Sequence, residues 1–76
     1  MLNASEKAYI QALLALKHKD YQMAASQFDA AARNFADNRE FKLLHETTRL
    51  LLAVRTERKR LNGSDVIQIQ EVFSNG

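Results

Sequence analysis

The chain has 76 residues, which is room for one domain, close to the size at which a single hydrophobic core is only just sufficient. It contains no cysteine, which excludes disulfides and thiolate metal sites, and it has no proline and only two glycines, so residues that break helices are scarce. Eleven basic against nine acidic residues give a net charge of +2, which is too small to indicate nucleic-acid binding by itself.

The composition and the first element both indicate an all-α fold. Good helix formers, such as alanine, leucine, glutamate, lysine and arginine, dominate the chain. A first helix should begin near Asn3, because Asn3 and Glu6 have the spacing of a capping box. Ile10 and Leu14 fall outside the apolar arc of this helix. They indicate either a second contact or ordinary exposed side chains.

A second helix should cover roughly residues 21–35, with Asp20 as its N-cap. Its apolar stripe alternates small and aromatic residues at intervals of three and four: Tyr21, Ala24, Ala25, Phe28, Ala31, Ala32 and Phe35. The alanines allow a neighbouring helix to approach closely, and the three rings should be structural. The short break at residues 18–20 predicts that the first two helices are antiparallel neighbours.

A third, longer helix should begin near Asn38, because Asp37 and Glu40 repeat the capping spacing, and run to about Arg60. Asn62–Gly63 then supplies a stop signal. The apolar arc of this helix is wide. It has Leu43, Leu50, Val54 and Leu61 on one edge, Leu44 and Leu51 in the middle, and Phe41 and Leu52 on the other edge. This is more apolar surface than a helical hairpin covers.

The pattern therefore predicts an antiparallel three-helix bundle over residues 1–62 and a short C-terminal element over residues 63–76. Within the latter, Ser64 can cap a short helix, whereas Ile67 to Gln70 alternate in the manner of a strand. We favour a short helix. It should dock on the third helix or on a second copy of the chain.

Catalysis and membrane insertion are not expected. The chain has no glycine-rich phosphate loop, no zinc-protease motif and no cysteine nucleophile, and His18 and His45 lie far apart in the sequence. We therefore predict that the protein is not an enzyme and uses no cofactor or metal. The apolar runs are far shorter than the ~20 residues of a membrane span, and the N-terminus has no secretory pattern, so a cytoplasmic location is expected.

A basic cluster follows the apolar arc of the third helix at Arg55, Arg58 and Lys59. Cations suit the C-terminal part of a helix, and their long stems can cover apolar surface. The alternative is a docking site for an acidic partner or for nucleic acid. Nucleic-acid binding would rest on Arg49, Arg55, Arg58, Lys59 and Arg60. No glycine or aromatic residue is interleaved among them to stack bases, so this binding is not expected.

Residues 5–36 resemble a tetratricopeptide repeat. The similarity lies in Lys19–Asp20–Tyr21, where that family prefers Gly-Asp-Tyr, and in small and aromatic residues at the family's positions on both helices, namely Ala12, Ala24, Phe28 and Ala31. Four positions depart from the pattern: Ala8, Gln11, Lys19 and Ala36. The outline of the chain is also similar to the three-helix MIT domain. Either resemblance implies recognition of a peptide or helix in a groove between helices.

The surplus of apolar surface predicts a small protein–protein interaction module of the adaptor or chaperone type. One version is a homodimer whose third helices pair along Leu43, Thr47, Leu50, Val54 and Leu61. The other is a groove for an amphipathic helix, formed by Tyr9, Leu13 and Leu16 with part of the third helix. The candidate partner-binding residues are Tyr9, Leu13, Leu16, Leu43, Leu50, Val54, Arg55, Arg58 and Lys59.

Overall fold

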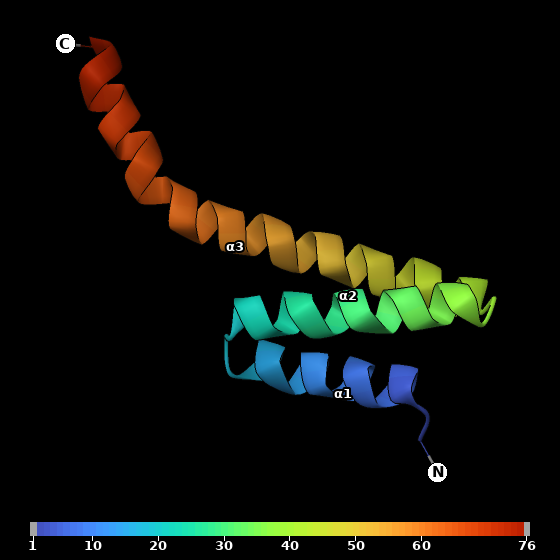
Figure 1. Ribbon diagram of the computed structural model, residues 1–76. Helices are drawn as coiled ribbons and strands as arrows, with labels where there is room; N and C mark the ends of the chain where they lie inside the picture. The colour runs from blue at the N-terminus through green and yellow to red at the C-terminus, as the bar shows by residue number, and fades with distance from the viewer. Residues whose placement is uncertain (1, 76) are drawn as a thin grey trace.

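In a computed structural model the chain forms three α-helices: α1 (Ala4–Lys17), α2 (Tyr21–Asp37) and α3 (Phe41–Asn75). The structure describes the backbone of residues 2–75 and the side chains of residues 2–61. Within those limits it contains no strand, so the predicted all-α class is confirmed. The chain turns back after α1 and again after α2, and α2 lies between the other two helices (Figure 1).

The starts of α1 and α2 are held by side-chain caps, as predicted. The Oδ1 atom of Asn3 accepts a hydrogen bond of 2.8 Å from the backbone N–H of Glu6. The Oδ1 atom of Asp20 accepts one of 3.1 Å from the backbone N–H of Met23. Each bond satisfies one of the N–H groups that have no partner in the first turn of a helix.

The predicted start of α3 near Asn38 is wrong, because Asn38 caps the C-terminus of α2 and α3 begins at Phe41. The α3 helix also continues past the predicted end near Arg60. The predicted stop at Asn62–Gly63 does not end it, because a single internal glycine costs a helix only ~1 kcal/mol. The predicted docking of the short element over residues 63–76 depends on side chains that lie outside the described ones.

The two interhelical turns have the same hydrogen-bonded geometry. Lys19 and Arg39 both adopt a left-handed backbone conformation, with φ of 60° and 58°. After α1, the N–H of Asp20 donates to the carbonyl of Ala15 at 2.8 Å. After α2, the N–H of Glu40 donates to the carbonyl of Phe35 at 2.9 Å. These are Schellman caps, in which glycine is the preferred residue at the left-handed position.

The core is centred on α2. Its predicted stripe is buried almost completely: Ala24, Ala25, Phe28, Ala31, Ala32 and Phe35 are buried, and Tyr21 packs against them while partly exposed. From the other helices, α1 contributes Ser5, Ala12 and Ala15, and α3 contributes Thr47, Leu51 and Val54. The α2 helix has extensive contact with both neighbours, whereas contact between α1 and α3 is slight. The molecule is therefore a layer with α2 in the middle, and α1 and α3 do not close on each other.

Candidate binding groove

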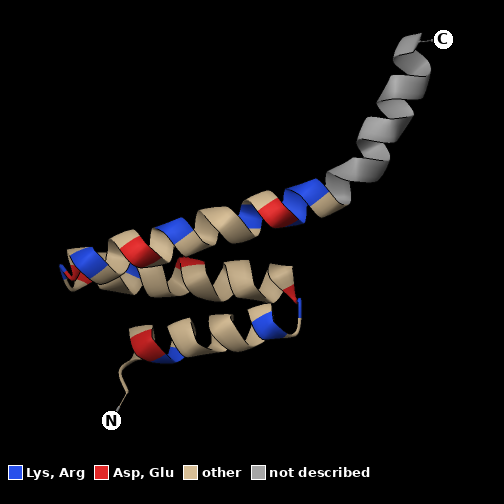
Figure 2. Ribbon diagram, turned by 180° about the vertical axis from the view of Figure 1, so that it is seen from behind, with Lys and Arg blue, Asp and Glu red and all other residues tan. Residues whose placement is uncertain are grey.

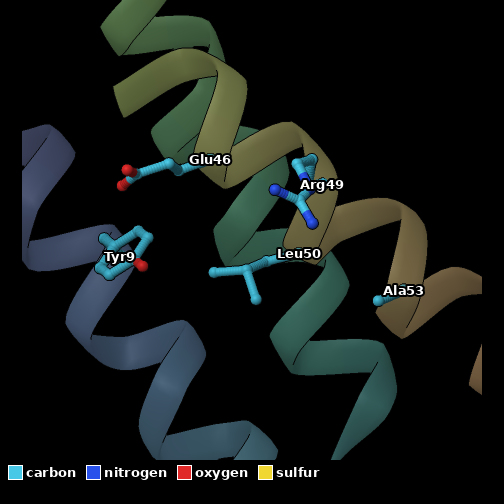
Figure 3. A pocket seen from close by; sticks show the side chains of 5 residues that line it. All are labelled: Tyr9, Glu46, Arg49, Leu50 and Ala53. Carbon is cyan, nitrogen blue, oxygen red and sulfur yellow. The ribbon is translucent and has the colours of Figure 1, made fainter. Parts of the chain in front are cut away.

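A groove runs between α1 and α3, because both helices pack on α2 while barely touching each other. It contains two hollows of about 380 and 370 Å³. The first is lined by Tyr9, Glu46, Arg49, Leu50 and Ala53 (Figure 3). The second is lined by Leu2, Glu6, Tyr9, Ile10, Phe35, Leu43 and Glu46. Because Tyr9 and Glu46 line both hollows, the two hollows are neighbours along the groove.

Aromatic packing onto α2 holds the α1 side of the groove. The ring of Tyr9 meets the ring of Phe28 edge to face, with centroids 5.7 Å apart. It meets Phe35 in the same manner at 6.5 Å. Phe28 is fully buried and Phe35 is 2% exposed, so Tyr9 packs directly on the hydrophobic core. Edge-to-face pairs add ~0.5–1.5 kcal/mol beyond the burial of their area, which keeps Tyr9 in place.

The α3 side of the groove is built by one face of that helix. Leu43, Glu46, Leu50 and Ala53 recur at intervals of three and four, which places them on the same side. Figure 3 shows Leu50 extending toward Tyr9 from the opposite wall. Apolar side chains remain open to solvent on both walls, since Leu2, Ile10 and Leu43 are 45%, 40% and 40% exposed.

The charged groups of the groove are two carboxylates and one guanidinium. Glu6 projects from α1, and Glu46 and Arg49 come from α3. Among the described residues, none of the three takes part in an ion pair within bonding distance. The groove therefore combines apolar walls with a small excess of negative charge.

The structure brings together some of the predicted partner-binding residues and separates others. Tyr9, Leu43 and Leu50 line the groove. Leu13 is 41% exposed but lines neither hollow, and Leu16 packs against the core. Val54 is 3% exposed and belongs to the core.

Seven residues that line the groove were not predicted as partner-binding from the sequence: Leu2, Glu6, Ile10, Phe35, Glu46, Arg49 and Ala53. A signal for some of them was present. Glu46 and Ala53 share a helical face with Leu43 and Leu50, and Ile10 stood out as an apolar residue among polar ones. Packing on α2 decides which side of α3 is turned toward α1, and the spacing of residues along the sequence does not specify it.

The homodimer seam predicted along α3 is not available in the form proposed. Thr47 is fully buried and Val54 nearly so within a single chain, because both face α2. The hydroxyl of Thr47 donates a 2.6 Å hydrogen bond to the carbonyl of Leu43, which satisfies this buried group. A second copy cannot reach these two residues without displacing α2.

The basic cluster lies along the last described turns of α3, where Figure 2 shows several basic residues. Arg55 is 3.9 Å from Asp29 of α2, measured from Nη2 to Oδ1. Arg58 and Lys59 are exposed and form no ion pair among the described residues. Arg60 donates to Glu57 at 2.6 Å, and this hydrogen bond lowers the pKa of the Glu57 carboxyl.

Two other kinds of site are absent from the described residues. Among these residues, none of the helices offers a stretch with the length and apolar character that crossing a membrane requires. In the same part of the chain, no three acidic or histidine side chains gather closely enough to hold a metal ion. No protein-family model matches the chain, and neither a curated protein nor a solved structure shows significant similarity to it. The resemblance to a tetratricopeptide repeat and the resemblance to an MIT domain thus both stay predictions from the residue pattern.

Proposed function

We propose that this protein is an interaction module that binds a helical or extended segment of another protein in the groove between α1 and α3. The observation that carries the proposal is the pair of neighbouring hollows that share Tyr9 and Glu46, with exposed apolar side chains on both walls. Concave apolar surfaces with a few polar groups are typical of binding sites. An adaptor or chaperone-type role is the function class that such a groove supports.

A protein segment suits this groove better than a compact small molecule does. The two hollows lie side by side, each open to solvent and each lined by apolar side chains. An amphipathic helix presents apolar side chains at intervals of three and four residues, ~5–6 Å apart, so neighbouring anchors can enter neighbouring hollows. The resemblance to a helical-repeat hairpin supports the same mode of binding.

The test uses peptides of ~16 residues, about four helical turns, selected from a random displayed library against the whole chain. Leu43→Asp should weaken binding of the selected peptides at least tenfold, because it places a charge on the apolar wall of the groove. Leu52→Asp is the matched control: Leu52 is on the same helix, is 57% exposed and lines neither hollow. Far-ultraviolet circular dichroism checks that both variants are folded. Equal affinity of the peptides for Leu43→Asp and the parent would contradict the proposal.

A second candidate function is attachment of an acidic partner to the basic cluster. It is favoured by Arg58 and Lys59, which are exposed and have no ion pair among the described residues. Such binding should weaken steeply with salt. Titration with polyglutamate, duplex DNA and single-stranded RNA at low and physiological salt tests it, and no binding at low salt would eliminate it.

A further inference from the structure

We infer that the segment bound in the groove carries a lysine or arginine beside its apolar anchors, and that this cation lies between Glu6 and Glu46. The inference rests on the proposed function and specifies the chemistry of the partner. It predicts an amphipathic, basic segment and disfavours an acidic one.

Two glutamates line the same hollow from opposite walls. Glu6 belongs to α1 and Glu46 to α3, and the hollow that they line also contains Leu43. A side chain entering this hollow therefore has a glutamate on either side. Neither carboxylate has an ion-pair partner among the described residues, so both are available to an incoming cation.

The apolar lining of this hollow suits the stem of a basic side chain. Ile10 and Leu43 are both 40% exposed there, and Phe35 closes the hollow from α2. Lysine and arginine bury their methylene stems on apolar surface while the charged group stays among polar partners. The hollow offers apolar surface and carboxylates together. A purely apolar ligand, by contrast, would desolvate the carboxylates without compensation.

Arg49 makes the two ends of the groove differ in charge. It lines only the hollow that contains Ala53, while Glu6 lines only the hollow that contains Leu43. The potential is thus most negative at the Leu43 end and is offset toward the Ala53 end. A bound segment should place its cation at the Leu43 end and a neutral or acidic residue near Arg49.

The experiment compares three synthetic versions of one selected peptide by fluorescence anisotropy. They differ at the position nearest the Leu43 end, which carries lysine, glutamine or glutamate. The parent protein should prefer lysine over glutamine about two- to fivefold for each carboxylate at low salt, since partly exposed ion pairs are weak, and should bind the glutamate version least. Glu6→Gln and Glu46→Gln should each reduce this preference, and the double variant should abolish it.

Two further variants separate the possible failures. Arg49→Gln should increase the preference for lysine over glutamine, because it removes a cation that repels the peptide's lysine. Leu43→Asp should weaken both the lysine and the glutamine versions, and the lysine version less, because the new carboxylate attracts its cation. If peptides bind through Leu43 but lysine gives no advantage over glutamine, or glutamate binds best, the basic-partner inference is wrong and the groove function stands. If no peptide depends on Leu43, the groove function itself fails.

Discussion

The helices α2 and α3 show what a second neighbour does to an apolar face. The stripe of α2 is narrow and rich in alanine, and it is buried because α1 and α3 cover it from two sides. The arc of α3 is wide and rich in leucine, but over the described residues its extensive contact is with α2. Leu51 and Val54 are buried, while Phe41 and Leu52 remain 64% and 57% exposed. A regular stripe is thus completed within the chain, whereas a wide arc leaves surface for a partner.

The largest expected difference in stability is between two phenylalanine-to-alanine variants, one on α2 and one on α3. Phe28→Ala on α2 should cost ~3–5 kcal/mol of the free energy of unfolding, because Phe28 is fully buried. A domain whose whole stability is of the order of 5 kcal/mol would keep only ~0–2 kcal/mol, so up to about half of the molecules would be unfolded. Phe41→Ala on α3 should change it by less than ~0.5 kcal/mol. Urea denaturation measures both, and similar losses for the two variants would break the comparison between the helices.

The turns that lead into α2 and α3 should respond alike to glycine. Lys19→Gly and Arg39→Gly should each raise the free energy of unfolding by roughly 0.5–1 kcal/mol, because glycine adopts the left-handed conformation without a side-chain clash. Lys19→Ala and Arg39→Ala serve as controls that keep the clash and should not stabilise. Thermal and urea unfolding report the change. A gain at one turn only would show that the two turns are not equivalent. The difference in burial between α2 and α3 could then not be assigned to their neighbouring helices alone.

The smallest effect concerns the pH dependence of the exposed end of α3. The hydrogen bond from Arg60 lowers the pKa of Glu57 below its ordinary value. The pair therefore contributes its stability above the ordinary pKa of glutamate, and this contribution is lost as the pH falls through the lowered value. A carboxyl titration by NMR should show the lowered pKa of Glu57 and its return to normal in Arg60→Gln. An unchanged pKa in that variant would remove Arg60 as the cause.

Much of the fold could be predicted because its signals are local. Asn3 and Asp20 are capping residues directly before apolar periods, and the α2 stripe specifies a buried face. The start of α3 was missed because Asp37 and Asn38 also serve as the end of α2. Capping residues that suit both the end of one helix and the start of the next cannot be assigned from spacing alone.

The groove could be predicted only in part. Tyr9, Leu43 and Leu50 line the groove and were candidates from the sequence, because they are large apolar residues on helical arcs. Val54 lies at the same edge as Leu43 and Leu50 but is buried, because the packing of α3 on α2 covers some positions of that edge and leaves others open. Glu46 was missed for a related reason: its place facing α1 depends on α2 holding the two outer helices apart.

The central claim is that α1 and α3 leave an apolar groove open for a partner, and intermolecular NOEs test it most directly. With methyl-labelled protein and a selected peptide, we expect contacts from Ile10, Leu43 and Leu50 to the apolar side chains of the peptide. Contacts confined to Leu52 on the outer side of α3, with none from these three residues, would contradict the account.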